Sequence, residues 1–375
     1  MNVVEVFPVG RPAGPADLVD RAEFMNDLTQ RLSDGQSVML AGPRRTGKSS
    51  VAAEALRRLR EGGAYTAAVD LFHVADVEEL GSKLLHAVLE NRTGVYGRSI
   101  RAASGLREWL GRAEFRAKVH DLELGVVLAA ERPDPIALLE GAIATVERLA
   151  EHDQRLCVVL MDEFQEVERL GGEGLLKRLR ALFQQQRHTA YLFLGSQTTM
   201  MQTIFADRRH AFYRFATALG LPEVPTEAWR DYIRRRIAEQ DLHITEPALG
   251  HLLERTGGHP YCTMVVAYNG FVHARTHDLR EISADVVHYA YEKALEMLEG
   301  VYEVQLHDVH RIKHADRVFA ALTEGRPPYA LPLNPAQVTA AIAHLVKIAL
   351  VLRGARRGEY RLVDPMFGDW YRRKR

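Results

Sequence analysis

The chain has 375 residues, with 49 basic (Lys and Arg) and 49 acidic (Asp and Glu) side chains, so its formal net charge at pH 7 is zero. This length predicts two or three domains rather than one core, and the balanced charge excludes an overall electrostatic argument for a nucleic-acid partner. Because the sequence contains neither an apolar stretch of about 18 residues nor a charged-then-apolar leader, we expect a cytoplasmic protein with no membrane contact.

The first predicted elements surround a glycine-rich loop. Helical periodicity over residues 22–33 is followed by a strand-like run at 37–41 and a second helical segment at 49–60. The loop between the strand and the second helix matches Gly-x-x-x-x-Gly-Lys-Ser, the phosphate-binding loop of P-loop nucleotidases. Its candidate nucleotide-binding residues are Gly42, Pro43, Arg44, Arg45, Thr46, Gly47, Lys48, Ser49 and, directly after them, Ser50.

This loop has the residue types that ATP binding requires. Its glycines let backbone N–H groups turn toward an anion, and the helix that follows presents its positive dipole end to the same phosphates. We expect Lys48 to contact the β- and γ-phosphates and the Ser49 hydroxyl to hold Mg²⁺.

Strand and helix patterns continue to alternate after the loop. A strand is predicted at 65–72 and a helix at 77–90. Alternation of this kind predicts a parallel sheet with helices on both faces, which is an α/β fold. Residues 91–133 interrupt the alternation of strands and helices and are interpreted as an insertion on the core. This insertion is either a surface that binds a partner or a solvent-exposed segment without a partner.

An acidic pair follows the next buried strand. The continuous apolar run 157–161 is typical of a strand covered on both faces, and it ends in Asp162 and Glu163. Carboxylates at the end of a buried strand are costly unless a cation or a reaction uses them. We expect Asp162 to orient Mg²⁺ through its water shell and Glu163 to act as the base for an attacking water.

A third apolar run, at 190–194, leads into Ser196 and Gln197. A polar side chain leaving a strand beside the acidic pair could contact the γ-phosphate or the attacking water, and the sequence does not separate these two candidates. The alternative is a plain strand-to-helix turn in which the polar residues cap a helix.

The two cysteines, Cys157 and Cys262, are far apart in the sequence and lie in apolar settings. They are predicted to be buried free thiols in a reducing compartment. Neither a disulfide nor a cysteine metal site is expected.

Beyond residue 222 the strands are expected to stop. Helical periodicity over 226–241, 246–255, 261–276 and 283–300 predicts an α-helical second domain. The predicted boundaries are therefore a P-loop core at 1–222, with the insertion at 91–133, a helical lid domain at 223–305 and a third domain at 306–375.

The third domain resembles a winged helix-turn-helix. Helices are predicted at 315–324 and 335–349, with a Pro-rich turn between them and a hairpin at 351–363 after them. The turn between the helices leaves little room for the usual middle helix. The polar side chains that the helix at 335–349 offers to a base edge are Gln337, Thr339, His344 and Lys347.

The end of the chain is basic. From residue 350 to 375 there are eight basic residues against three acidic ones, which gives a net charge of +5. Arg353, Arg356 and Arg357 cluster at the predicted hairpin tip, where a wing would meet phosphates. This favours non-specific binding of double-stranded DNA, whereas the few polar residues on the helix argue against sequence readout. The alternative is a winged helix used for protein contacts within an oligomer.

Taken together, the motifs resemble those of archaeal-type P-loop ATPases of the AAA+/STAND group. The matching segments, in family order, are Leu18–Phe24, Gly42–Ser49, Asp162–Gln165, Gly257–Pro260 and Asp364–Trp370. The resemblance covers nearly all of the chain and implies an ATPase core, a helical lid and a C-terminal winged helix. It also implies that Asp20 and Arg21 lie close to the adenine.

The chain departs from the family pattern at two positions. Asp20 stands where the family usually has Gly, and His259 stands where many AAA+ lids supply an arginine to the γ-phosphate. The resemblance further implies that Arg214 projects into a neighbouring subunit as an arginine finger, with Arg208 and Arg209 as competitors. A simpler alternative is that Arg214 pairs with a surface carboxylate.

Two functional hypotheses follow from the sequence. The first is an ATPase that hydrolyses Mg-ATP and couples it to DNA binding through the winged helix. The second is a nucleotide-gated interaction switch with slow hydrolysis, which self-associates or binds a protein client and has no direct DNA role. ATP and Mg²⁺ are the expected cofactors in both.

Overall fold

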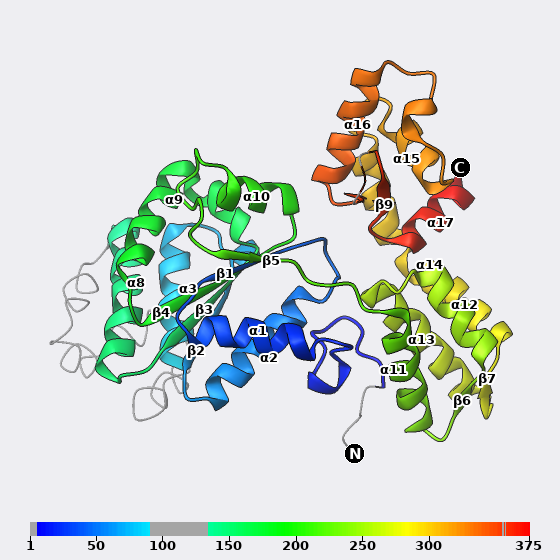
Figure 1. Ribbon diagram of the computed structural model, residues 1–375, viewed down its shortest axis with the longest axis horizontal. Helices are drawn as coiled ribbons and strands as arrows, with labels where there is room; N and C mark the ends of the chain where they lie inside the picture. The colour runs from blue at the N-terminus through cyan, green and yellow to red at the C-terminus, as the bar shows by residue number, and fades with distance from the viewer. Residues whose placement is uncertain (1–5, 91–133, 355, 357) are drawn as a thin grey trace.

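The computed structural model describes residues 6–90, 134–354, 356 and 358–375, and the predicted insertion at 91–133 lies outside them. Its N-terminal part is built on a five-stranded parallel sheet with the strand order β2-β3-β4-β1-β5 (Figure 1). The strands are β1 (Val38–Ala41), β2 (Tyr65–Asp70), β3 (Cys157–Asp162), β4 (Thr189–Gly195) and β5 (Thr217–Leu219). This confirms the parallel α/β sheet predicted from the alternation of strands and helices.

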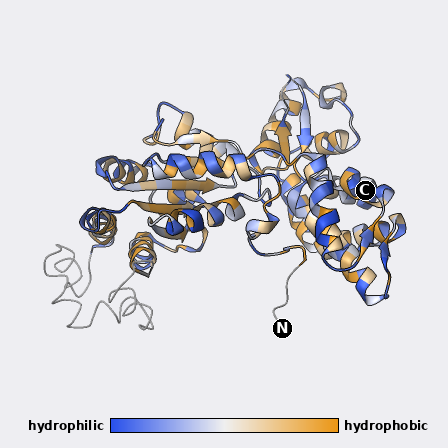
Figure 2. Cartoon of the chain, turned by 60° about the horizontal axis from the view of Figure 1, so that its bottom comes forward, coloured by the Kyte–Doolittle hydropathy of each residue, from blue (hydrophilic) through white to orange (hydrophobic). Residues whose placement is uncertain are grey.

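Helices cover both faces of this sheet. Alternate residues of β3 enter two different cores: Val159 and Met161 pack on one face, whereas Val158 and Leu160 pack on the other. Figure 2 shows the resulting hydrophobic character along the strands. The helices of this part are α1 (Ala22–Ser33), α2 (Lys48–Glu61), α3 (Val77–Glu90), α8 (Pro135–His152), α9 (Val167–Gln185) and α10 (Thr198–Ala206).

The lid is helical, as expected, but it is not free of strands. Its helices are α11 (Thr226–Ala238), α12 (Glu246–Thr256), α13 (Pro260–Thr276) and α14 (Ala284–Val309). Between them, β6 (His243–Ile244) and β7 (Glu281–Ile282) form a short parallel pair. The prediction that strands stop after residue 222 is therefore wrong, because strands of two residues are too short to show an alternating pattern.

The C-terminal part has the winged-helix arrangement. Helices α15 (Ala315–Thr323) and α16 (Pro335–Lys347) precede a hairpin of β8 (Val351–Arg353) and β9 (Tyr360–Leu362). A single 3₁₀ turn at Pro328–Ala330 stands between the two helices, which agrees with the lack of room for a middle helix. A final helix, α17 (Pro365–Lys374), was not predicted as an element.

The lid and the winged helix share one continuous hydrophobic core. Phe319 of α15 and Phe367 of α17 belong to the same cluster as Trp229 of α11 and Tyr302 of α14. Phe7, from the N-terminal segment, is also part of this core and is fully buried. In Figure 1 the sheet therefore lies on one side, and the lid and winged helix lie together on the other.

Both cysteines are buried and free, as predicted. Burial raises the pKa of the Cys157 thiol to about 12, so it stays protonated at neutral pH. None of the helices in the described residues is long and apolar enough to cross a membrane.

Candidate active site

The P-loop connects β1 to α2 and folds as its glycines require. Gly47 adopts φ = 97°, a left-handed conformation that L side chains rarely take, directly before α2 begins. Arg45 is also left-handed, with φ = 65°. The backbone N–H of Gly42 donates to the carbonyl of Gly195 at 3.3 Å, which anchors the start of the loop to β4.

Lys48 curls back over its own loop. Its Nζ donates to the backbone carbonyls of Gly42 at 2.7 Å and Pro43 at 2.6 Å. Burial lowers the pKa of Lys48 to about 8, although the nearby Glu163 and Asp162 favour the charged form. A cation held in this way can exchange its carbonyl partners for phosphate oxygens with little movement.

Ser49 and Asp162 meet at the carboxyl end of β3. The Ser49 hydroxyl donates to Asp162 Oδ2 at 3.4 Å. Burial raises the pKa of Asp162, although the backbone N–H of Glu163 donates to its Oδ1 at 2.9 Å. Among the described residues, no group of three or more His, Cys, Asp or Glu could hold a metal ion. The two oxygen donors fit Mg²⁺, which prefers one or two protein oxygens and completes its shell with water and phosphate.

Glu163 is held at the same sheet edge by Ser196, which directly follows β4, and by Gln165, two residues after Glu163 itself. Its carboxylate accepts from the Ser196 hydroxyl at 2.8 Å and from the Ser196 backbone N–H at 3.2 Å. The buried Gln165 side chain also donates to it. Sequence reasoning missed Gln165, and it left Ser196 and Gln197 unseparated. The structure brings Ser196, and not the cap-position Gln197, into contact with the acidic pair.

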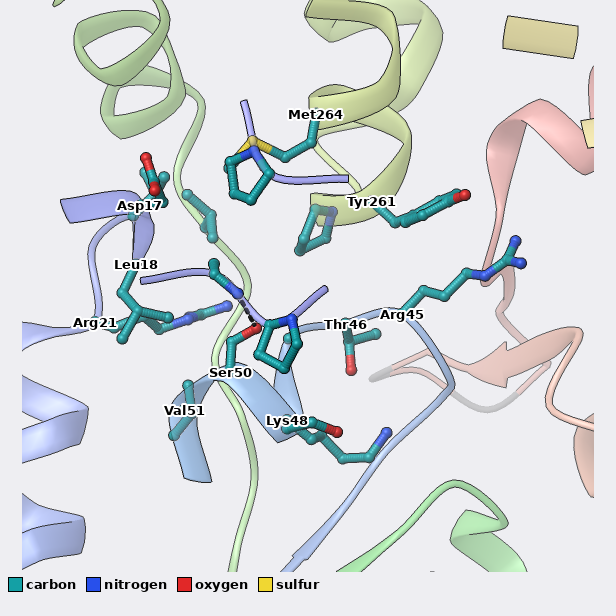
Figure 3. Close-up of a pocket in the computed structure, with 18 of the residues that line it drawn as sticks. Asp17, Leu18, Arg21, Arg45, Thr46, Lys48, Ser50, Val51, Tyr261 and Met264 are labelled. Carbon is teal, nitrogen blue, oxygen red and sulfur yellow. Dashed lines mark hydrogen bonds between the residues drawn. The ribbon is translucent and has the colours of Figure 1, made fainter. Parts of the chain in front are cut away.

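A cavity of about 480 Å³ lies between the P-loop and the lid (Figure 3). Tyr261 and Met264 of α13 face Thr46 of the P-loop and Ser50 of α2 across it. Its walls also include the N-terminal residues Pro8, Gly10, Arg11, Pro12 and Ala13, which the sequence analysis did not assign. The backbone N–H of Ala13 donates to Ser50 Oγ at 2.9 Å and ties this segment to α2.

Only part of the predicted adenine box faces the cavity. Leu18, Val19 and Arg21 line it, but Asp20 is exposed and outside the lining. Asp20 adopts φ = 50°, which explains why glycine suits this position and why Asp, which tolerates the left-handed region, can replace it. Arg21 is buried and donates to the carbonyl of Pro222 at 2.6 Å, so it joins the box to the linker before the lid.

His259, which the family resemblance places near the γ-phosphate, is not among the residues that line the cavity, and its role toward the nucleotide stays a prediction. It caps α13, where its Nδ1 accepts from the backbone N–H of Cys262 at 3.4 Å. Burial lowers its pKa, while Asp364 of the winged helix favours its charged form. Charges from two sides act on this ring, because Arg45 of the P-loop opposes the effect of Asp364. Arg45 also links the P-loop to the lid, with its guanidinium 4.4 Å from the Tyr261 ring centre.

The three candidate finger arginines differ in their partners. Arg209 pairs with Asp207 at 2.7 Å. Arg214 is exposed, with φ = 56°, and lies over the Tyr213 ring at 5.2 Å. No described carboxylate forms an ion pair with Arg214 or Arg208, so the alternative of a surface ion pair for Arg214 finds no support in the described residues. Their role toward a second subunit stays a prediction.

Most of the C-terminal positive charge is neutralised within the chain. On the last helix, Arg372 pairs with Asp369 at 3.1 Å, and Arg373 pairs with Glu292 at 2.5 Å. Lys374 pairs with Glu303, also at 2.5 Å. Arg361 pairs with Glu223 at 2.8 Å, and Arg375 lies 4.0 Å from Glu324. The net charge of +5 therefore overstates the basic surface. Arg353 and Arg356 are exposed and have no ion pair within the described residues, and Arg357 lies outside them.

Three of the four polar residues of α16 make hydrogen bonds within the chain, whereas Lys347 is exposed and has no hydrogen bond or ion pair in the described residues. His344 Nε2 lies 2.8 Å from the carbonyl of Asp308, and Gln337 closes a capping box with Asn334. The Thr339 hydroxyl donates to the carbonyl of Pro335 at 2.9 Å. These contacts strengthen the argument against sequence readout by this helix.

The sequence matches no family model and no curated protein sequence. Solved structures, however, resemble the whole chain. A Walker-type ATPase of Pyrococcus abyssi has a TM-score of 0.72 at 17% identity, with 98% of this chain and 99% of that chain covered. The ORC2 protein of Aeropyrum pernix, solved in ADPNP–ADP complexes, has a TM-score of 0.61 at 15% identity, with 99% and 98% covered.

A third similar structure is the Aeropyrum pernix ORC1 protein in complex with DNA. Its TM-score is 0.51 at 16% identity, and the alignment covers 96% of this chain and 94% of that chain. Identities this low establish the fold and leave function to the site itself. The chain thus has the fold of AAA+ ATPases, with a P-loop core, a helical lid and a C-terminal winged helix.

Proposed function

We propose that this protein is a Mg²⁺-dependent ATPase. The observation that carries the proposal is the meeting of three groups at one sheet edge: the P-loop with Lys48 and Ser49, Asp162 on β3, and Glu163 held by Ser196. The nucleotide would place its phosphates on the P-loop and its base in the cavity against the lid. When bound, Mg²⁺ would neutralise charge on the β- and γ-phosphates.

The proposed reaction is an in-line attack of water on the γ-phosphorus. A new oxygen–phosphorus bond forms as the bond to the β-phosphate oxygen breaks, and Glu163 takes the proton of the water. Lys48 would leave the carbonyls of Gly42 and Pro43 to contact phosphate oxygens. Asp162 and Ser49 supply the oxygen donors for the cation.

The direct test compares Glu163→Gln with Lys48→Ala. We expect Glu163→Gln to bind ATP with near-normal affinity and to lose at least about 100-fold in turnover, because it lacks the base. Lys48→Ala should lose ATP binding itself. Unchanged ATP affinity in Lys48→Ala, measured by isothermal titration calorimetry, would contradict the assignment.

We further propose that the wing binds double-stranded DNA through phosphate contacts. Arg353 and Arg356 are exposed and unpaired within the described residues, and one protein of the same fold is the ORC1 protein solved with DNA. Duplex DNA at moderate salt should stimulate ATP turnover. Changing Arg353, Arg356 and Arg357 together to Ala should abolish the stimulation without altering basal turnover.

The alternative function is a nucleotide-gated switch that binds a protein or a second copy of the chain. It is favoured by the contacts of Glu163, because Ser196 and Gln165 together donate three hydrogen bonds to its Oε2 and so lower the basicity of that oxygen. The neutralised C-terminal surface also favours it. No stimulation by DNA, together with nucleotide-dependent assembly in analytical ultracentrifugation, would support the switch.

A further inference from the structure

Two neighbouring arginines of the P-loop lie in different surroundings. Arg45 contacts the lid, with its guanidinium over the Tyr261 ring. Arg44 instead contacts the catalytic edge of the sheet, with Nε 3.5 Å from Ser196 Oγ. Arg45 has a left-handed backbone, with φ = 65°. The two adjacent P-loop arginines therefore occupy different positions, one at the lid and one beside the proposed catalytic groups.

The position of Arg44 places a positive charge among the proposed catalytic groups. The hydroxyl that it contacts also donates to Glu163 at 2.8 Å. Its charge is close enough to Lys48 to lower the pKa of that ammonium, an effect opposite to that of Glu163 and Asp162. Lys48, Asp162, Glu163 and Ser196 are the groups that would surround the terminal phosphate.

Arg44 also has no competing anion. It is exposed, and no carboxylate in the described part of the chain forms an ion pair with it. Its contact with a neutral hydroxyl at 3.5 Å is long and weak. A guanidinium in this state gains most from a phosphate oxygen, to which it can donate two parallel hydrogen bonds.

The lid does not supply this charge. His259 of the lid is buried, which lowers its pKa, and its Nδ1 accepts from the backbone N–H of Cys262, so it presents a neutral ring rather than a cation. None of the lid residues that line the cavity beside the P-loop is a cation; they are Val224, Trp229, Pro260, Tyr261 and Met264.

We infer that Arg44 binds the γ-phosphate from within the same chain and thereby distinguishes ATP from ADP. This inference rests on the proposed ATPase function and assigns it a specific discriminating residue. On binding ATP, Arg44 exchanges the Ser196 hydroxyl for γ-phosphate oxygens. Because Ser196 also holds Glu163, the same exchange links detection of the γ-phosphate to the contacts of the base.

The test measures the affinities of fluorescent ATP and ADP analogues, with Mg²⁺, for the full chain and for Arg44→Ala, Arg44→Lys and Arg45→Ala. Arg44→Ala should weaken the affinity for ATP by about 10- to 100-fold and leave the affinity for ADP within about twofold of the wild-type value, because only ATP carries the γ-phosphate that Arg44 contacts. Arg45→Ala is the matched control, and it should weaken both nucleotides by the same factor.

Single-turnover hydrolysis provides the second measurement. Arg44→Ala should reduce the rate at saturating ATP by at least about 100-fold, and Arg44→Lys should restore little of it, since lysine lacks the planar pair of donors. Equal losses of ATP and ADP affinity in Arg44→Ala, with wild-type binding intact, would overturn the inference alone. Failure of the wild-type chain to bind either nucleotide would overturn the proposed function and the inference with it.

Discussion

At the scale of single residues, the site is organised by competition for a few polar partners. Ser196 donates to Glu163 and lies beside Arg44, so one hydroxyl connects the proposed base to a P-loop cation. Lys48 is bonded to two carbonyls of its own loop. Each of these contacts has to be exchanged when a phosphate enters, so nucleotide binding rearranges hydrogen bonds that already exist.

The hydrogen bond from the Ser196 hydroxyl to Glu163 predicts what happens when that hydroxyl is removed. Ser196→Ala deletes the 2.8 Å hydrogen bond and leaves the backbone N–H contact at 3.2 Å. The Gln165 side chain also stays bonded to the same oxygen, so Oε2 keeps two of its three donors. A hydrogen bond to a charged group contributes about 1.5–3 kcal/mol, so its loss makes the carboxylate a stronger base and basal ATP turnover should rise several-fold. Gln197→Ala, at the neighbouring position, should leave turnover unchanged. A fall comparable to that of Glu163→Gln would mean that Ser196 positions the base rather than restrains it.

The lowered pKa of Lys48 predicts the pH dependence of nucleotide affinity. In the free protein the pKa is about 8, and bound phosphate favours the charged ammonium, so the complex holds the proton more tightly than the free protein does. Affinity for ADP should therefore be constant below pH 7 and weaken as the pH rises above 8, by up to about tenfold per unit. Calorimetric titrations between pH 6.5 and 9.5 test this, and constant affinity up to pH 9.5 would contradict it.

At the scale of elements, Asp364 joins three helices. Its Oδ1 accepts from the backbone N–H of Phe367 at 3.0 Å, which caps α17, and from Cys262 Sγ of α13 at 3.3 Å. Its Oδ2 accepts from the hydroxyl of Tyr302 on α14 at 3.3 Å. Close by, a Cβ on Gly257 would lie 2.9 Å from the Pro365 ring. The Gly-Gly-His-Pro and Asp-Pro motifs, which are about 100 residues apart in the sequence, thus form one junction between lid and winged helix.

This junction predicts an unusually large effect for a helix-cap substitution. Asp364→Ala removes a cap and leaves the buried donors of Cys262 and Tyr302 without a partner, so the free energy of unfolding should fall by about 2–4 kcal/mol. Asn334→Ala removes the exposed cap of α16 and should lower the free energy of unfolding by only about 1 kcal/mol. Urea denaturation followed by circular dichroism compares the two, and equal losses would show that Asp364 acts as a cap alone.

The elements also show what the sequence can and cannot reveal. The long strands were predictable because β3 and β4 are continuous apolar runs, and α1 and α3 were predictable from their periodicity. The strands β5, β6 and β7 have two or three residues each, which is too short for a pattern. His259 was found by its motif, but a motif fixes a position along the chain and not the direction of the side chain. The ion pairs of Arg373 and Lys374 are formed with Glu292 and Glu303 of α14, which is distant in sequence, so no local pattern reveals them.

At the scale of the whole molecule, the N-terminal segment connects the lid to the P-loop. Arg236 of α11 donates to the carbonyl of Val6 at 2.9 Å, and the Tyr232 hydroxyl donates to Asp17 at 2.8 Å. The same segment lines the cavity and reaches Ser50 through the N–H of Ala13. Nothing in its composition marks it as part of a site, because its contacts are made largely by the backbone.

Phe7 allows this connection to be tested. It is fully buried in the lid core, 6.1 Å from the ring of Tyr232. Phe7→Ala should lower the free energy of unfolding by about 3–5 kcal/mol and also weaken ADP binding, because the segment loses its anchor. Phe319→Ala, equally buried in the winged helix of the same core, should destabilise to a similar degree without changing ADP affinity. Equal ADP affinities in the two variants would contradict the connection.

The shared core of lid and winged helix has a mechanical consequence. Helix α14 has 26 residues, which corresponds to about 39 Å, and its far end packs within the winged helix. If the lid turns by about 10° when nucleotide binds, this helix acts as a lever and moves its far end by about 7 Å. A rearrangement of a few hydrogen bonds at the P-loop is thereby amplified into a displacement of the winged helix that is longer than one helical turn. The wing then reports on the nucleotide by its location, without any change in its own structure.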